Sequence, residues 1–345
     1  MRILHVSEAF GGGLRTAVVN YITATADLEH TVFARVRQGH ETLDLPDEAR
    51  FVGFEGSLTQ FLYAARRLIL DENYEVVHLH SSYAGLLRRI LPQSVRIIYS
   101  PHCFAMETQN RPPVKLAYWA AEKFLSRRPQ VLVAVSPRER DLGVELNWRT
   151  NARVIENAVV PESSTTGCLV TPHIPSPTGP RVISMTGRIS RQKDPWFFAE
   201  VAKHFDPELF RFRWIGDGEE GRAALVAAGV EITGWLSPEL TGKELRGTDL
   251  YLHTAAWEGG PLATLEAAAA GCAVMSRSIP SMESLGYHTI GKTADQAALA
   301  VYRFFASTQY QQLVVDQTAE VLKRCSFENM SRDLHEMYSR AVRSL

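Results

Sequence analysis

The sequence predicts an α/β protein made of two Rossmann-like domains, each built around a parallel sheet. Three observations lead to this fold class. Short apolar runs alternate with amphipathic helical stretches, the chain has 345 residues, and a segment rich in proline, serine and threonine interrupts the alternation. Alternating strands and helices are typical of doubly wound parallel sheets, and this length suits two domains of roughly 150 residues.

The N-terminal domain is predicted over residues 1–160. Short runs rich in Val and Ile mark its strands, and segments 14–26 and 59–70 have the apolar spacing of helices. The expected strands cover residues 2–6, 30–36, 75–80, 96–102, 131–136 and 153–159.

Residues 161–180 are predicted as a linker, because no helical or strand period persists there. Residues 181–326 are predicted as the C-terminal domain. Its expected strands cover residues 181–187, 210–216, 230–235, 249–255 and 272–278. Ligands of such sheets bind beyond the carboxyl ends of the strands, so we expect a cleft between the two domains.

Residues 327–345 are predicted as a C-terminal helix that packs back on the body of the protein. Its apolar residues recur at three- and four-residue spacing, at Met330, Leu334, Met337, Tyr338 and Ala341.

Composition excludes several classes of protein. The net charge of -1 gives no overall attraction to nucleic acid, and no run approaches the ~20 apolar residues of a membrane helix. The first residues read as a strand, so we expect no signal peptide. The four cysteines lie far apart, which favours a reduced, cytoplasmic protein without structural zinc.

Positive charge is concentrated between Leu86 and Arg128, where eight Lys or Arg stand against two acidic residues. Such a stretch can face an anionic membrane or an acidic acceptor, which would make the protein peripheral at the inner face of a membrane. A solvated helix face is the alternative interpretation.

The segment EGGPLATLEAAAAG, residues 258–271, is predicted to turn from a strand into a helix. We expect Gly259 and Gly260 to end the strand and Pro261 to be the first helical residue. The backbone N–H groups of Leu262 and Ala263 then have no acceptor within the helix, and such a helix end attracts phosphate.

Two carboxylates flank this turn, Glu258 before it and Glu266 within the helix. Carboxylates accept paired hydrogen bonds from vicinal hydroxyls. The segment therefore indicates a ligand that carries phosphate and sugar hydroxyls.

A second cluster of candidate residues lies in GRISRQKDP, where Arg188 and Lys193 follow a predicted strand and the turn at Gly187. Fixed cations of this kind neutralise a diphosphate, and they do so most strongly when it gains charge as a leaving group. We therefore predict that both side chains face the cleft.

Glycines after other strands are further candidates. Gly12 and Gly13 lie between the first strand and its helix, where the absence of side chains lets backbone approach a phosphate. The dinucleotide fingerprint G-x-G-x-x-G fails here because Thr16 occupies the third position. Gly216 follows the strand FRFRWI and is predicted to border a nucleotide.

Histidines end two of the predicted strands. His102 ends RIIYSPH at the carboxyl edge of the first sheet and can donate to a hydroxyl. His78 and His80 in EVVHLH are interpreted as facing opposite sides of their strand, with His80 toward the cleft. The chain has no Asp-x-Asp pair and its histidines lack metal-ligand spacing, so we expect no metal and no cofactor.

These motifs together resemble GT-B glycosyltransferases, family 4 especially. Residues 258–271 are similar to the family signature EG-x-P…LEA-x-A-x-G, and GRISRQKDP to its GR-x5-K-G segment, with Asp194 where glycine is usual. The glycines Gly12 and Gly13 look like the family's glycine loop. The resemblance implies the GT-B fold, with two Rossmann-like domains, and a retaining, metal-independent transfer of a hexose or an N-acetylhexosamine.

The resemblance also implies roles for single residues. Glu258 would orient the transferred sugar, His102 would assist beside it, and Glu266 would hold the ribose. The donor would be a nucleotide-sugar, UDP-linked or GDP-linked, and the acceptor a saccharide or lipid-linked sugar of cell-surface polysaccharide or lipopolysaccharide assembly. The likeness weakens at Ala158, where glycine is usual, and after Val274.

Three alternatives remain at this point. A sugar-nucleotide epimerase shares the two-domain fold. A phosphorylase of the same fold would need a lysine that binds pyridoxal phosphate and usually a longer chain. A non-catalytic nucleotide-sugar-binding protein would keep the cleft without turnover.

Overall fold

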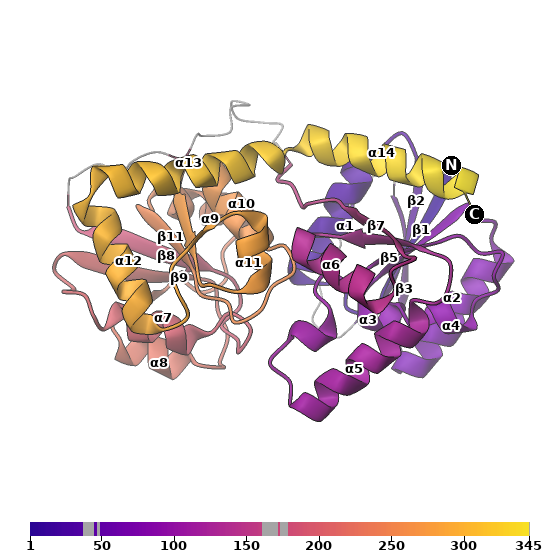
Figure 1. The fold of residues 1–345 in the computed structure, drawn as a ribbon, viewed down its shortest axis with the longest axis horizontal. Helices are drawn as coiled ribbons and strands as arrows, with labels where there is room; N and C mark the ends of the chain where they lie inside the picture. The colour runs from indigo at the N-terminus through magenta and orange to yellow at the C-terminus, as the bar shows by residue number, and fades with distance from the viewer. Residues whose placement is uncertain (37–44, 47–48, 161–171, 173–178, 345) are drawn as a thin grey trace. The chain divides into compact units, whose positions relative to one another are not determined.

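The computed structural model describes residues 1–36, 45–46, 49–160, 172 and 179–344. It divides into two compact units, Met1–Ala158 with Phe327–Leu345, and Val159–Ser326. Each unit holds a parallel sheet flanked by helices, which confirms the predicted fold class (Figure 1). Most of the expected linker, residues 161–171 and 173–178, lies outside the described residues.

The described part of the N-terminal unit has a seven-stranded sheet of order β3-β2-β1-β4-β5-β6-β7, parallel throughout. Its strands are β1 (Arg2–Ser7), β2 (Glu29–Arg35), β3 (Ala49–Phe54), β4 (Val76–His80), β5 (Ile97–Ser100), β6 (Val131–Ala134) and β7 (Asn151–Val154). The sequence did not indicate β3, and the strand expected over 96–102 ends at Ser100.

Helices cover both faces of this sheet. They are α1 (Gly12–Ala24), α2 (Leu58–Asp71), α3 (Ser81–Ala84), α4 (Leu87–Ile90), the 3-10 helix η1 (Ala105–Glu107), α5 (Pro112–Leu125), α6 (Pro137–Leu146) and α14 (Phe327–Ser344). Helix α14 lies beside α1, so both chain termini belong to this unit (Figure 1). Its apolar face is buried at Met330, Leu334, Met337, Tyr338 and Ala341.

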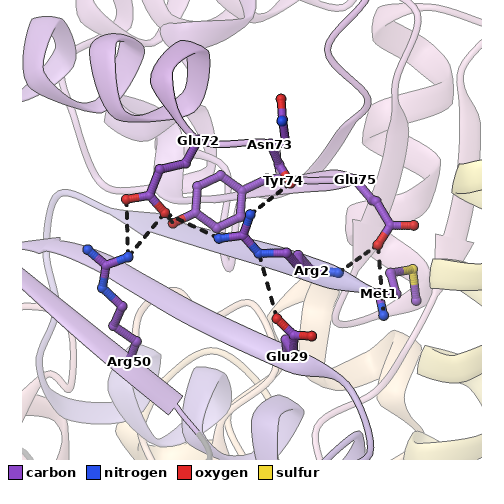
Figure 2. A network of polar contacts seen from close by, with 8 residues as sticks. All are labelled: Met1, Arg2, Glu29, Arg50, Glu72, Asn73, Tyr74 and Glu75. Carbon is purple, nitrogen blue, oxygen red and sulfur yellow. Dashed lines mark hydrogen bonds and ion pairs between the residues drawn. The ribbon is translucent and has the colours of Figure 1, made fainter.

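A network of charges joins the amino ends of β1 and β3 to the segment before β4 (Figure 2). The Arg2 guanidinium donates to the Asn73 carbonyl at 3.2 Å and to Glu72 Oε2 at 3.3 Å, while Arg50 pairs with the same carboxylate at 3.1 Å. The Arg2 backbone N–H donates to Glu75 Oε2 at 2.8 Å. These contacts lie at the edge opposite to the carboxyl ends, so they serve the sheet and not the candidate site.

The C-terminal unit has a sheet of order β10-β9-β8-β11-β12-β13 in its described part. Its strands are β8 (Arg181–Thr186), β9 (Phe210–Ile215), β10 (Glu231–Ile232), β11 (Leu250–His253), β12 (Ala273–Ser276) and β13 (His288–Thr289). Its helices are α7 (Pro195–Ala202), α8 (Arg222–Ala227), α9 (Pro238–Arg246), α10 (Leu262–Ala269), α11 (Pro280–Leu285), α12 (Ala294–Ala306) and α13 (Thr308–Arg324). The sequence did not indicate β13.

Strand order locates the binding edge of each sheet. The connections reverse direction between β1 and β4 in one unit and between β8 and β11 in the other. In open α/β sheets, ligands bind at the carboxyl ends of strands beside such a switch point. Most candidate functional residues lie in the loops that follow strands at these switch points. His102 and Gly216 follow the neighbouring strands β5 and β9.

Candidate functional site

In the C-terminal unit, the loops after β8 and β11 are joined by hydrogen bonds. The Ala256 N–H donates to the Gln192 carbonyl at 2.8 Å, and the Thr254 hydroxyl donates to the Lys193 carbonyl at 3.0 Å. The Gln192 side-chain amide donates to the Trp257 carbonyl at 3.3 Å. Since each loop supports the other, residues 192–193 and 257–258 are held together beside the switch point.

Lys193 and Glu258 form an ion pair at this place. Lys193 Nζ lies 2.5 Å from Glu258 Oε1, and the two side chains are 16% and 8% exposed. Buried His253 at the end of β11 places Nε2 at 3.4 Å from the same oxygen. Burial raises the pKa of Glu258, but the charge of Lys193 and the contact with His253 outweigh it and hold this pKa at about 2. Glu258 is therefore a fixed anion.

Glu266 on α10 belongs to the same group, because the charge of Lys193 acts on both carboxylates. Burial raises the pKa of Glu266, and Lys193 only partly offsets this rise. The two glutamates thus differ: one is held ionised by a cation, whereas the other binds a proton more readily than an ordinary glutamate.

Two details of the predicted turn are wrong. Strand β11 ends at His253, not at Gly259 and Gly260, and Pro261 is the residue that caps α10 instead of its first helical residue. The helix begins at Leu262, so Leu262 and Ala263 occupy its first turn, where N–H groups have no acceptor within the helix. Gly271, with φ +98°, follows the end of α10 as expected of a helix stop.

The structure explains why glycine is usual at the position of Asp194. This residue has φ 53° and ψ 67°, a left-handed conformation that favours glycine. Its carboxylate accepts from the Phe197 N–H at 3.1 Å, which caps α7, and from Arg277 at 2.6 Å. Aspartate at this position has a steric cost that glycine would not have, but its side chain caps α7 and pairs with Arg277.

Gly216 and Gly187 approach each other closely. A Cβ built on Gly216, where φ is +137°, would lie 2.2 Å from the Gly187 carbonyl oxygen. Glycine at 216 is therefore required for packing between the loops after β9 and β8. Arg188 follows Gly187, is exposed, and contacts no charged partner among the residues that the structure describes.

In the N-terminal unit, Gly12 and Gly13 open α1. Both are exposed, and added Cβ atoms would meet nothing within 4 Å. Gly12 has φ +55°, and the preceding Gly11 supplies no side-chain cap. The first turn of α1 is thus open backbone at the carboxyl end of β1.

His102 follows β5 at the carboxyl edge of the same sheet. It has left-handed backbone with φ 55°, and Cys103 has φ 120°. The carboxylate of buried Glu139 holds this turn, since it accepts from the Cys103 N–H at 2.7 Å and from the Val135 N–H at 2.8 Å. Burial lowers the pKa of His102 to about 4, so its imidazole is neutral near pH 7.

The expectation that His78 and His80 face opposite sides of β4 is wrong. Residues two apart on a strand share a face, and these two rings stack with centroids 4.1 Å apart. His80 Nδ1 lies 2.9 Å from His102 Nε2, and His5 on β1 lies 3.0 Å from His80. The sequence spacing does not reveal that these histidines converge.

Sequence reasoning missed His253, Glu139 and His5. His253 ends a strand, as His102 was expected to, and the same signal would have found it. Glu139 lies in a Ser-Pro-x-Glu segment that reads as an ordinary helix start, and Ser136 does cap α6. Nothing in the local pattern indicates that its carboxylate is buried.

The basic stretch between Leu86 and Arg128 is only partly surface. Arg88 is buried in an ion pair with Glu122 at 2.7 Å, and buried Arg128 donates to the Leu91 carbonyl at 2.5 Å. What remains exposed is a set of basic and apolar side chains on and beside α5 and at the end of α4, called here the basic apolar face. Its members are Arg89, Ile90, Arg111, Val114, Leu116, Trp119, Lys123, Phe124 and Arg127.

The chain is similar to known glycosyltransferases over most of its length. Residues 11–163 match the family model described as Glycosyltransferase Family 4, and residues 180–302 match that of Glycosyl transferases group 1. An uncharacterized 41.2 kDa protein in the cps region of Klebsiella pneumoniae is 24% identical over 299 residues, 82% of each chain. Among the described residues, no helix has both the length and the apolar character needed to span a bilayer.

A relative of named activity is the UDP-Gal:alpha-D-GlcNAc-diphosphoundecaprenol alpha-1,3-galactosyltransferase of Escherichia coli. It is 28% identical over 233 residues, which are 61% of this chain and 59% of that enzyme. The match therefore spans about three fifths of the relative.

Two solved structures have the same fold. Sucrose-phosphate synthase from Thermosynechococcus elongatus has a TM-score of 0.82 at 13% identity, with both chains covered in full. HepE of Anabaena, in complex with UDP and glucose, has a TM-score of 0.79 at 15% identity over 99% of this chain and 100% of that one.

Proposed function

The chain belongs to the GT-B glycosyltransferases of the family 4 kind, and on that basis we propose that it transfers a hexose from a UDP-sugar to an acceptor hydroxyl. The observation that carries the proposal is the Lys193–Glu258 pair at the switch point, followed directly by the open first turn of α10. A cation, an ionised carboxylate and free helix N–H groups are what a sugar diphosphate requires.

The donor is held by groups with separate tasks. Lys193 and Arg188, with the first turn of α10, neutralise the diphosphate, so no metal ion is needed for that purpose. Glu258 accepts hydrogen bonds from hydroxyls of the transferred hexose, and Glu266 from those of the ribose. Gly12 and Gly13 approach the phosphates with backbone, and Gly216 borders the base.

The reaction retains configuration at the anomeric carbon. The acceptor oxygen forms its bond to that carbon on the face from which the nucleotide leaves. The bond from carbon to the phosphate oxygen breaks, and the departing diphosphate takes the acceptor proton. The cations stabilise the charge that develops on the diphosphate, and no protein general base is required.

The preference for UDP rests on relatives. The Escherichia coli enzyme is named for UDP-Gal, and HepE was solved with UDP. A thermal-shift screen of UDP, GDP and ADP and their hexose derivatives tests this preference, because a ligand that binds the folded state raises its apparent stability. Stabilisation by UDP compounds alone is expected, and stabilisation by GDP compounds alone would move the donor to that class.

The acceptor is a lipid-linked saccharide of surface polysaccharide assembly on the cytoplasmic side of a membrane. Two relatives support this: one is named for a GlcNAc-diphosphoundecaprenol acceptor, and the other lies in a cps region. The basic apolar face supports it too, because Trp119, Leu116 and Phe124 are 39%, 64% and 50% exposed beside cations. Apolar rings and cations together suit the surface of an anionic bilayer.

Co-sedimentation with liposomes tests the membrane contact. The protein should bind vesicles that contain anionic lipid and not neutral ones, and Trp119→Ser with Phe124→Ser should abolish binding. The matched control is Trp148→Ser, whose indole is 75% exposed on another part of the unit. Binding to neither kind of vesicle would contradict this part of the proposal.

A further inference from the structure

Four histidines form a continuous chain of hydrogen bonds across the N-terminal sheet. His30 Nδ1 lies 3.1 Å from His5 Nε2, His5 Nδ1 lies 3.0 Å from His80 Nε2, and His80 Nδ1 lies 2.9 Å from His102 Nε2. The chain starts in the core beside Thr25 and ends at the partly exposed His102.

Thr25 sets the direction of the chain. Its carbonyl oxygen lies 2.9 Å from His30 Nε2, and a carbonyl can only accept. Its hydroxyl oxygen lies 3.1 Å from the same nitrogen, but the hydroxyl proton is already donated to the Tyr21 carbonyl at 2.7 Å. Both neighbours of His30 Nε2 are therefore acceptors, so this nitrogen carries the proton.

The remaining protons follow in sequence. A neutral imidazole has one donor and one acceptor nitrogen, so His30 Nδ1 accepts and His5 Nε2 must donate to it. By the same reasoning His80 Nε2 donates to His5 Nδ1, and His102 Nε2 donates to His80 Nδ1. Burial lowers the pKa of all four imidazoles, which keeps them neutral near pH 7.

We infer that His30, His5 and His80 are positioning residues that hold His102 in the Nε2–H form, so that its Nδ1 lone pair accepts a hydrogen bond from a hydroxyl of the transferred hexose. This inference rests on the proposed function for the identity of the hydroxyl. His102 Nδ1 has no hydrogen-bond partner among the described residues, and left-handed backbone held by Glu139 fixes the ring at the sheet edge.

In this tautomer His102 can accept from a sugar hydroxyl but cannot donate to one, contrary to the expectation from the sequence. If the ring could also present its N–H, it could either donate to the sugar hydroxyl or accept from it. It would then also bind a group that only accepts hydrogen bonds in place of the hydroxyl. A ring with only a lone pair outward can bind a hydrogen-bond donor such as a hydroxyl. A group that can only accept hydrogen bonds would find no donor there, which is unfavourable at a partly buried site. We therefore expect a donor sugar with its hydroxyl replaced by fluorine to lose the contribution of His102.

A metal site is the competing use of this cluster, since ligand atoms of His5, His78 and His80 lie within 4.8 Å of one another. Every ring nitrogen of the three already has a protein partner, because His78 contacts Tyr338 Oη at 3.0 Å and Ser100 Oγ at 2.8 Å. A cation would have to break several buried hydrogen bonds, so the cluster fits a proton chain better than a metal.

Nitrogen-15 NMR of histidine side chains in the full-length protein tests the inference without relying on activity. The spectrum identifies which ring nitrogen carries the proton, and the resonances are assigned with His102→Gln and His80→Gln variants. The expected result is an Nε2–H form at His30, His5, His80 and His102, unchanged by EDTA. An Nδ1–H form at His102, or a spectrum altered by EDTA, would overturn it.

Substitution of His30 tests the coupling over distance. His30→Leu should give His102 a mixture of tautomers and lower kcat by about tenfold, the effect of one hydrogen bond. His30→Gln should restore both, because its amide can donate to Thr25 and accept from His5. The matched control is Tyr338→Phe, which removes a buried hydrogen bond to His78 outside the chain.

The two hypotheses fail separately. If His102 has the expected tautomer but the protein transfers no sugar, the proposed function is wrong and the hydrogen-bond chain stands. If transfer occurs and His30→Leu leaves both the His102 tautomer and kcat unchanged, the positioning role is wrong.

Discussion

Lys193 Nζ and Glu258 Oε1 lie 2.5 Å apart at the carboxyl edge of the C-terminal sheet. The residues come from the loops after β8 and β11, which flank the switch point, and hydrogen bonds between the loops hold them in place. When a sugar donor binds, this ion pair can open, so that Lys193 contacts the phosphate and Glu258 contacts the sugar hydroxyls.

The two glutamates should have different effects when changed. Glu258→Gln should lower kcat on the order of 10- to 100-fold and leave the affinity for free UDP nearly unchanged, because its partner is the sugar. Glu266→Gln should weaken UDP and UDP-sugar alike by about tenfold, because its partner is the ribose. Calorimetric titration with UDP and steady-state kinetics measure both. Equal behaviour of the two variants would refute the division of roles, and Arg50→Gln in the network of Figure 2 serves as the remote control.

Removal of the cation should destabilise the C-terminal unit. Lys193→Met leaves the buried Glu258 carboxylate without its ion partner, which costs about 3 kcal/mol of unfolding free energy. The double variant with Glu258→Gln should recover much of this loss. Urea unfolding measures both. The control is Lys203→Met, whose pair with Glu200 is more than half exposed and should matter by less than about 1 kcal/mol.

Asp194 offers a test of backbone conformation. Asp194→Gly and Asp194→Ala both lose the cap of α7 and the pair with Arg277, but only glycine adopts φ 53° without steric cost. The alanine variant should therefore be less stable than the glycine variant by about 1 kcal/mol. Thermal unfolding of the two variants side by side decides it, and equal stability would mean that the left-handed conformation is relaxed.

Acid should destabilise the N-terminal unit. In the folded protein the pKa of His102 is lowered to about 4, and the pKa values of His5, His78 and His80 are lowered too. The unfolded chain therefore binds protons at these histidines more readily than the folded protein. Their contribution is complete above pH 6.5 and is lost as pH falls toward 4; His102 alone accounts for about 3 kcal/mol. Urea unfolding measured between pH 7.5 and 5 checks the fall.

Glu139 changes stability with pH in the opposite direction and therefore serves as a control. Burial raises its pKa to about 7, so the folded protein gains a proton between pH 7 and 4.5 that the unfolded chain does not bind, and this stabilises the fold as pH falls. Glu139→Gln removes this opposing contribution and should steepen the acid loss. A flat profile between pH 6.5 and 5 in either protein would contradict the buried, neutral state of the histidines.

Much of the fold follows from local pattern. Central strands such as β4 and β11 are buried along their length, so their apolar runs are continuous and easy to find. The missed strands, β3 and β13, lie at sheet edges. Edge strands bury less, and the exposed Arg50 and Gly53 in β3 leave no apolar run to detect.

The candidate site was predictable where one segment carries both the turn and its functional group. The sequence indicated Lys193, Glu258 and Leu262 as candidates because glycines and proline mark the loops that hold them. Partners that are distant or packed in the core could not be predicted, because the contacts of His30 with Thr25 and of Glu139 with Cys103 depend on tertiary packing. For the same reason, the charges of Arg88 and Arg128 could not be recognised as buried from their position in a basic stretch.

Retaining sugar transfer is tested most directly by an assay with radiolabelled UDP-hexoses and a lipid-linked GlcNAc-diphosphate acceptor, with the linkage in the product determined by NMR. We expect a new glycosidic bond that keeps the donor's anomeric configuration, formed in the presence of EDTA and abolished or strongly reduced in Glu258→Gln. Tight UDP-sugar binding without transfer would identify a binding protein, and release of an epimerised UDP-sugar an epimerase. Either result, or a product of inverted configuration, would contradict retaining sugar transfer by this protein.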